Sequence, residues 1–130
     1  MSSFISLITL LTLVLMFATG IIVGAARGKY QVKAPATAGH PMFERAYRVQ
    51  MNTIEQVLLF LPSLWLAHGY GYTNVAAIIG AIWLLARTGY IITYLRDPAQ
   101  RGLPFTVSIL CSAILMGLAG FGIIMRLISG

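Results

Sequence analysis

Apolar residues occur along the chain in runs long enough to form membrane-spanning helices. The first run covers residues 4–26, which are 23 residues without a charge, and a spanning helix needs roughly 20 apolar residues. The second run reaches this length only if the polar residues 44–56 belong to the same helix. The pattern predicts helices at about residues 4–26, 43–68, 72–95 and 104–127. We therefore expect a single all-α domain over residues 1–130, an integral membrane four-helix bundle.

The composition supports a membrane protein. Of the 130 residues, 58% are hydrophobic and 9% are charged, whereas soluble globular domains carry about 25% charged residues. This composition argues against a soluble fold and against disorder, and a single Cys argues against a disulfide scaffold. The first apolar run has no basic residue before it and exceeds the core length of signal peptides, so we expect a retained helix.

The charges are unevenly distributed, with nine Lys and Arg against three acids. Seven basic residues lie in or beside the first and third connections: Arg27, Lys29, Lys33, Arg45, Arg48, Arg96 and Arg101. The opposite side has only Arg126. Because basic loops stay in the cytoplasm, both of these connections are predicted to be cytoplasmic and both termini to lie on the other side.

Small residues recur on the first and fourth predicted helices, at Gly20, Gly24 and Gly28 and at Ala113, Gly117 and Gly120. Small side chains let helix backbones approach closely within a membrane. We expect these positions to be packing surfaces. We also expect a four-helix chain of this size to assemble with copies of itself.

The second predicted helix carries polar residues where a spanning helix should be apolar. Arg48, Asn52 and Glu55 are spaced at i, i+4 and i+7 and therefore share one face. An ionisable group inside a spanning segment costs about 2.5–3.5 kcal/mol on insertion scales. This face must line the bundle interior, a subunit interface or a water-filled cavity.

The third predicted helix repeats the pattern near its end. Arg87, Tyr90 and Tyr94 share one face, and Arg101 follows just beyond that helix. The orientation places these groups at the same end as the polar face of the second helix, so we expect them to converge. The alternative is structural, with ion pairs between helices and tyrosines at the membrane interface. The cost of burying charge favours a functional site.

The residue types indicate what such a site would bind. Arginine side chains match carboxylates in bidentate fashion, and a single glutamate can accept from an ammonium group. A small zwitterionic peptide with several carboxylates and one amine fits this set. An arginine beside a thiol would also favour the thiolate form.

Two stretches resemble signatures of the MAPEG family, the membrane-associated proteins in eicosanoid and glutathione metabolism. The first is residues 43–55, FERAYRVQMNTIE, and the second is residues 86–90, ARTGY, with Tyr94 and Arg101 after it. The resemblance is to the microsomal glutathione transferase and leukotriene C4 synthase branch. It implies a homotrimer of four-helix subunits, with glutathione held between neighbouring subunits near the cytoplasmic face.

The resemblance also implies roles for individual residues. Arg101 matches the arginine that stabilises the glutathione thiolate. The implied glutathione contacts are Arg48, Asn52, Glu55, Tyr90 and Tyr94, with Arg27 and Gln50 contributed by the adjacent subunit. Gln56 stands where the family's eicosanoid members often have an aromatic residue, and Gly28 stands where the leukotriene C4 synthases have a second arginine. Both departures disfavour a leukotriene substrate.

We therefore expect a detoxifying glutathione transferase that conjugates the thiolate to lipophilic electrophiles, with glutathione peroxidase activity on lipid hydroperoxides as an extension. Its expected partners are itself, membrane lipids and the electrophile, without nucleic acid. The alternative is a non-catalytic lipid-binding or scaffold protein like the 5-lipoxygenase-activating protein branch, which lacks an arginine matching Arg101. Cys111, His40 and His68 are too scattered to predict a metal site.

Overall fold

The computed structural model describes residues 2–130 as an all-helical protein. Its α-helices are α1 (Ser3–Tyr30), α2 (Pro41–Gly69), α3 (Thr73–Arg96) and α4 (Gly102–Ser129), and the short 3₁₀-helix η1 (Pro98–Gln100) precedes α4. The predicted all-α class and the four predicted helices are confirmed.

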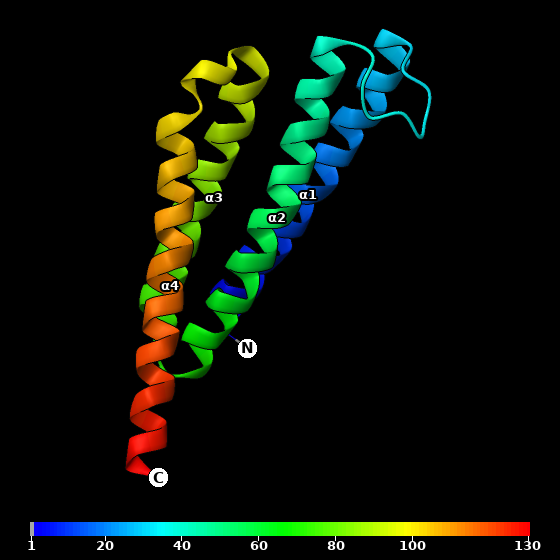
Figure 1. Ribbon diagram of the computed structural model, residues 1–130. Helices are drawn as coiled ribbons and strands as arrows, with labels where there is room; N and C mark the ends of the chain where they lie inside the picture. Colours follow the sequence, from blue (N-terminus) through cyan, green and yellow to red (C-terminus); the bar gives the residue numbers. More distant parts are fainter. Residues whose placement is uncertain (1) are drawn as a thin grey trace.

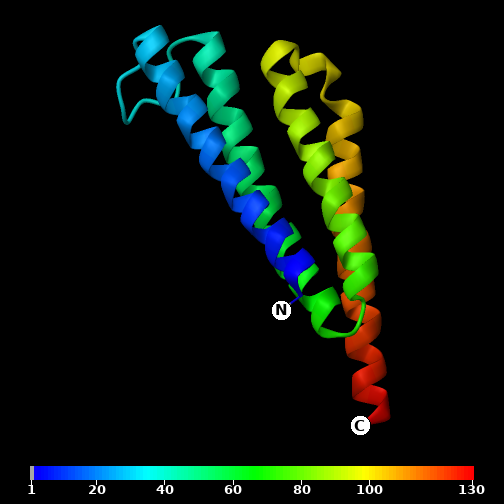
Figure 2. The same cartoon turned by 180° about the vertical axis from the view of Figure 1, so that it is seen from behind.

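The helices form two antiparallel hairpins, α1 with α2 and α3 with α4 (Figures 1 and 2). Both views show the hairpins close together at the α2–α3 turn and spread apart toward the opposite end, where the α1–α2 and α3–α4 connections lie. The two termini lie at the end of the α2–α3 turn. The two connections rich in basic residues are therefore at one end of the molecule, as the sequence predicted.

The helices extend beyond the apolar runs. For example, α1 continues past the predicted end at residue 26 to Tyr30 and stops at Gln31, whose left-handed backbone has a φ of 57°. The backbone N–H of Val32 then donates to the Arg27 carbonyl over 3.1 Å. Hydropathy identifies only the part of a helix that can lie in the hydrocarbon core of a bilayer. The helix itself can continue into polar surroundings until a capping conformation ends it.

Within residues 2–130, three helices, α1, α3 and α4, are long and apolar enough to cross a membrane. The polar residues of α2 set it apart, yet α2 contacts each of the other three helices along the bundle. A polar helix can occupy this position because neighbouring helices cover most of its length, so that few of its polar groups face lipid.

The apolar core that joins the four helices consists mostly of aliphatic side chains around one aromatic pair. The rings of Phe60 and Trp83 stack with their centroids 4.0 Å apart. Two glycines lie at close contacts: a Cβ at Gly80 would lie 3.2 Å from side-chain carbons of Ile8, and one at Gly122 would lie 2.6 Å from Cβ of Tyr70, the residue that follows α2.

The predicted small-residue surfaces do not join helices within the chain. A Cβ at Gly24, Gly28, Gly117 or Gly120 would meet no other atom within 4 Å among residues 2–130. Gly20 is the exception, because a Cβ there would lie 3.5 Å from Nε2 of Gln50. The spacing of the small residues therefore does not identify contacts between helices of the same chain.

Candidate functional site

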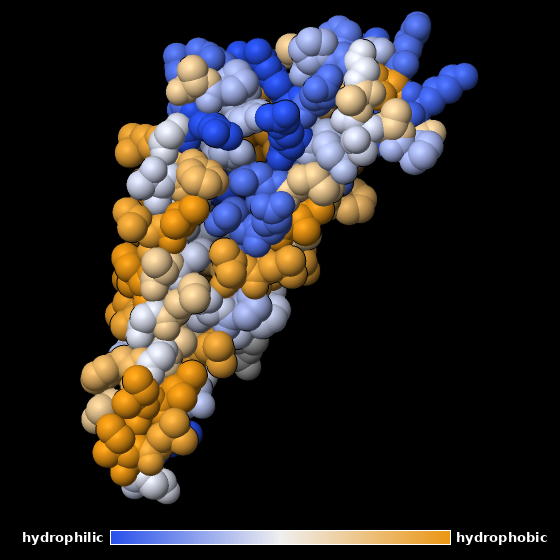
Figure 3. Space-filling view, in the orientation of Figure 1, coloured by the Kyte–Doolittle hydropathy of each residue, from blue (hydrophilic) through white to orange (hydrophobic). Residues whose placement is uncertain are grey.

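A polar cavity of about 310 Å³ opens between α2 and the α3–α4 hairpin. It is lined by Arg48, Met51, Asn52, Glu55, Tyr90, Tyr94 and Arg101. On the face shown in Figure 3, hydrophilic side chains gather between the hairpins toward the spread end, and hydrophobic side chains dominate below them. Six of the eight residues singled out from the sequence therefore lie around one cavity.

The α2 wall follows directly from helical spacing. Arg48, Asn52 and Glu55 project from successive turns toward the cavity, as their shared face predicted. Arg48 and Glu55 are exposed and Asn52 is half-buried. Among residues 2–130, Arg48 and Glu55 form no ion pair within 4.0 Å. The ion pairs between helices that the structural alternative expects for these two residues are therefore not found within residues 2–130.

The α3 wall is aromatic and rigid. Tyr90 and Tyr94 are 1% and 4% exposed, and their ring centroids lie 5.6 Å apart. Phe105 of α4 packs against Tyr90 with a centroid distance of 5.9 Å. Such packing fixes the ring positions, so the edge that each tyrosine presents to the cavity is set by the fold.

Arg101 completes the cavity from the amino end of α4. It is the residue that precedes this helix, it is exposed, and its Cζ lies 5.6 Å from the centroid of the Tyr94 ring. The first turn of a helix has free N–H groups and carries a partial positive charge. The helix end and the guanidinium therefore both make this corner of the cavity attractive to an anion.

Arg87 is the residue whose place the sequence reasoning missed. It is fully buried and lies behind the cavity wall, where its Nη2 donates to Oδ1 of Asn52 and, over 3.5 Å, to Oγ1 of Thr53. Its Cζ lies 3.9 Å from the Tyr90 ring centroid. Its shared face with Tyr90 and Tyr94 was the available signal, but helical spacing does not distinguish a residue in the wall from one behind it.

A side cavity of about 290 Å³ adjoins the main one and shares Arg48 and Tyr94 with it. Arg45 lines this side cavity and donates to the carbonyls of Leu95 and Arg96 over 3.4 and 3.2 Å. These carbonyls belong to the last turn of α3, which has no helical partners for them. Arg45 thereby links α2 to the end of α3 at the mouth of the cavity.

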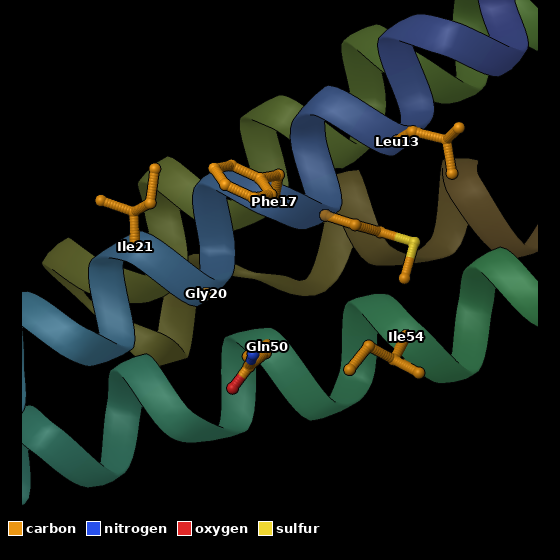
Figure 4. Close-up of a pocket in the computed structure, with 7 residues that line it drawn as sticks. Leu13, Phe17, Gly20, Ile21, Gln50 and Ile54 are labelled. Carbon is orange, nitrogen blue, oxygen red and sulfur yellow. The ribbon is translucent and has the colours of Figure 1, made fainter.

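Arg27 and Gln50 lie away from this cavity on the same chain. Nη1 of Arg27 donates to the Ala36 carbonyl over 2.8 Å, and its Cζ lies 4.8 Å from the Phe43 ring centroid. Gln50 lines a separate groove of about 600 Å³ between α1 and α2. Figure 4 shows this groove, in which the other labelled side chains are apolar.

The remaining candidate ligands have structural roles. Nδ1 of His40 accepts from the backbone N–H of Met42 over 3.1 Å and caps α2, and Nδ1 of His68 lies 2.8 Å from Oγ1 of Thr73. Cys111 is buried in the apolar core. Within residues 2–130, no three His, Cys, Asp or Glu side chains form a group that could hold a metal ion.

The cavity can recognise a small anion that also carries an amine. Two guanidinium groups and one carboxylate line it, so its own charge is net positive. Asn52 adds an amide, and the tyrosines add aromatic surface and hydroxyl groups. A volume of about 310 Å³ falls at the lower end of the range for small-molecule sites, which suits a ligand the size of a short peptide.

Comparison with known proteins places the chain in a family. The model of the MAPEG family matches residues 5–121. The chain belongs to the MAPEG family. The family resemblance seen in the two sequence stretches is therefore confirmed, and so is the membrane character that it implied.

Curated relatives cover most of the chain. An uncharacterized protein of Synechocystis sp. is 46% identical over 85% of this chain and 81% of its own length. Leukotriene C4 synthase of Bos taurus is 37% identical over 90% of this chain and 78% of its own length. Human microsomal glutathione S-transferase 2 is 36% identical over 78% of this chain and 69% of its own length. The relatives with named activities include a glutathione S-transferase.

Proposed function

We propose that this protein is a membrane-bound glutathione transferase that conjugates the glutathione thiolate to lipophilic electrophiles. The observation that carries the proposal is the cavity itself, in which six predicted residues from α2, α3 and the start of α4 come together. The similarity to microsomal glutathione S-transferase 2 supports it. The presence of Arg101 in the cavity favours this function over the scaffold alternative.

The charges of glutathione match those of the cavity. The tripeptide has two carboxylates and one ammonium group, and its thiol adds a third negative charge when ionised. Arg48 binds a carboxylate, and Glu55 accepts from the ammonium group. Asn52 and the two tyrosines provide neutral hydrogen-bonding groups around the peptide. Because Arg48 and Glu55 have no ionic partner among residues 2–130, a ligand can bind both without first breaking an ion pair.

Arg101 acts on the sulfur. Its positive charge and the amino end of α4 stabilise the thiolate relative to the thiol, so that more nucleophile is present near neutral pH. The thiolate attacks the electrophilic carbon of the second substrate and forms a carbon–sulfur bond, and the electron pair of the bond broken at that carbon departs with the leaving group. The proton lost from the thiol passes to water. With a lipid hydroperoxide, the thiolate attacks the terminal oxygen and the O–O bond breaks, which gives a sulfenic acid and, after protonation, the lipid alcohol. A second glutathione then attacks the sulfenic sulfur, so that the disulfide and water are released.

The working unit in this proposal is a homotrimer whose sites lie between subunits. Arg27 and Gln50 then contact the glutathione bound in the cavity of the neighbouring copy. Gln50 supports this arrangement, because its amide lies in an otherwise apolar groove on a spanning part of the molecule, where exposure to lipid is unfavourable. The small residues Gly24 and Gly117, which pack against no other part of the described chain, offer further surface to a second copy.

In the proposed orientation, each substrate can reach the cavity from the phase in which it dissolves. The basic connections and the cavity lie at one end of the bundle, which the distribution of Lys and Arg assigns to the cytoplasm. Glutathione enters from water at that end. The lipophilic electrophile reaches the sulfur from the bilayer.

The direct test is product formation by the purified protein in lipid nanodiscs. Glutathione and a chromogenic lipophilic electrophile are added, and the glutathione adduct is measured by absorbance and mass spectrometry. We expect a conjugation rate well above that of empty nanodiscs and a large loss in Arg48→Ala. A rate equal to that of empty nanodiscs would contradict the proposed function.

A further inference from the structure

Arg87 is a cation buried within α3, and among residues 2–130 no carboxylate lies within 4.0 Å of it. It is 0% exposed, and its hydrogen bonds go to the neutral side chains of Asn52 and Thr53. Its Nε and Nη1 atoms have no hydrogen-bond partner in the part of the chain that is described. An ionisable group at this depth is costly, and here no ion pair offsets the cost.

The bond from Arg87 determines which way the Asn52 amide points. A guanidinium group only donates hydrogen bonds, so the atom of Asn52 that it contacts must be the carbonyl oxygen. Asn52 also lines the cavity. With its oxygen held by Arg87, its NH₂ group is the part left to bind a ligand, and it can only donate.

Arg87 also contacts the ring of Tyr90. The guanidinium lies over this ring with Cζ 3.9 Å from its centroid, and Phe105 packs on it from α4. A cation over an aromatic face is attracted to it. Arg87 therefore contacts two residues of the cavity wall without lining the cavity itself.

We propose that Arg87 is a positioning residue that makes Asn52 a dedicated hydrogen-bond donor to a carboxylate or carbonyl oxygen of the bound peptide. This inference rests on the proposed function, because it takes glutathione as the ligand. Without Arg87 the amide can rotate and present its oxygen, which repels the same ligand atom. Arg87 itself does not line the cavity, so it acts through Asn52.

The test is a double-mutant cycle on the full-length protein in nanodiscs. Glutathione dissociation constants and conjugation kinetics are measured for wild type, Arg87→Met, Asn52→Ala and the double variant. Methionine has a comparable volume, and exchanging a buried ion for a hydrophobic side chain is often tolerated. Arg87→Lys serves as the conservative variant, since its ammonium group can still donate to the Asn52 oxygen.

We expect Arg87→Met to weaken glutathione binding about tenfold, the effect of one hydrogen bond to a charged group. The turnover number at saturating glutathione should stay near the wild-type value, because Arg101 is untouched. The double variant should bind no more weakly than Asn52→Ala alone, since the effect passes through that amide. Arg87→Lys should recover most of the affinity.

Wild-type affinity in Arg87→Met, or losses that multiply in the double variant, would overturn this inference while leaving the proposed function in place. Failure of the wild-type protein to bind glutathione would overturn both. If Arg87→Met does not fold, Asn52→Asp replaces it in the test. Its carboxylate accepts from Arg87 but has no donor for the ligand, so it should melt at or above the wild-type temperature and bind glutathione at least tenfold more weakly. Wild-type affinity in Asn52→Asp would contradict the inference.

Discussion

Replacing Arg101 by alanine should slow conjugation by removing the positive charge nearest to the proposed position of the sulfur. Arg101 lines the cavity and is exposed. Its guanidinium lies beside the Tyr94 ring and forms no ion pair with another of the residues 2–130. Few structural contacts are therefore lost in Arg101→Ala. The expected effect is on the ionisation of the bound thiol, with little change in the stability of the bundle.

The size of the effect follows from the exposure of Arg101. Two unit charges about 4 Å apart interact by about 1 kcal/mol in water and about 4 kcal/mol at an effective dielectric constant of 20. An exposed guanidinium falls toward the lower value, so we take about 1.4 kcal/mol, which is one pKa unit of the bound thiol. Below that pKa, the thiolate fraction and the rate at saturating glutathione should each fall about tenfold.

The assay follows thiolate and product together. Ultraviolet absorbance reports thiolate formation when glutathione is mixed with the protein, and the adduct of a chromogenic electrophile reports the rate over a range of pH. Arg101→Ala should move the rise in both signals about one pH unit upward, and Arg101→Lys should lie between it and wild type. An Arg101→Ala protein with the wild-type rate and pH profile would refute this role for Arg101.

Glu55→Gln should raise the dissociation constant of glutathione at least tenfold in calorimetry but not that of an analogue lacking the amine, because Glu55 is proposed to accept from the ammonium group. If the protein forms the proposed homotrimer, Gln50→Leu should weaken glutathione binding while cross-linking gives the same oligomer as for wild type; unchanged affinity would contradict a site shared between subunits. Gly122→Ala should lower the free energy of unfolding by about 1–3 kcal/mol, and with it the melting temperature, because the new Cβ would lie 2.6 Å from Cβ of Tyr70. Gly89→Ala is the matched control, with its nearest contact at 3.9 Å, and equal melting temperatures for the two would contradict the packing described here.

The helices and the cavity could be predicted because both depend on spacing along a helix. Residues four and seven apart lie on one face, so Arg48, Asn52 and Glu55 had to point the same way. Their cost in a membrane indicated that this face is turned away from lipid. Antiparallel hairpins then brought the end of α3 and Arg101 to the same end of the bundle.

What the sequence could not predict depends on how the helices are rotated against one another. Arg87 shares a face with Tyr90 and Tyr94, yet it lies behind the cavity wall and holds Asn52. Gly24 and Gly117 have the spacing of contact residues but meet no neighbour among residues 2–130, whereas Gly80 and Gly122 make close contacts that no motif indicated. The depth of a residue within a bundle is decided by packing between helices, which a pattern along one helix does not contain.

The central claim is that the polar cavity binds glutathione, and an equilibrium titration tests it most directly. Purified protein in nanodiscs is titrated with glutathione by calorimetry, with wild type and Arg48→Ala measured in parallel. The account predicts saturable binding to wild type that weakens steeply with added salt and falls at least tenfold in Arg48→Ala. Absence of binding to wild type, or equal affinity for the two proteins, would contradict it.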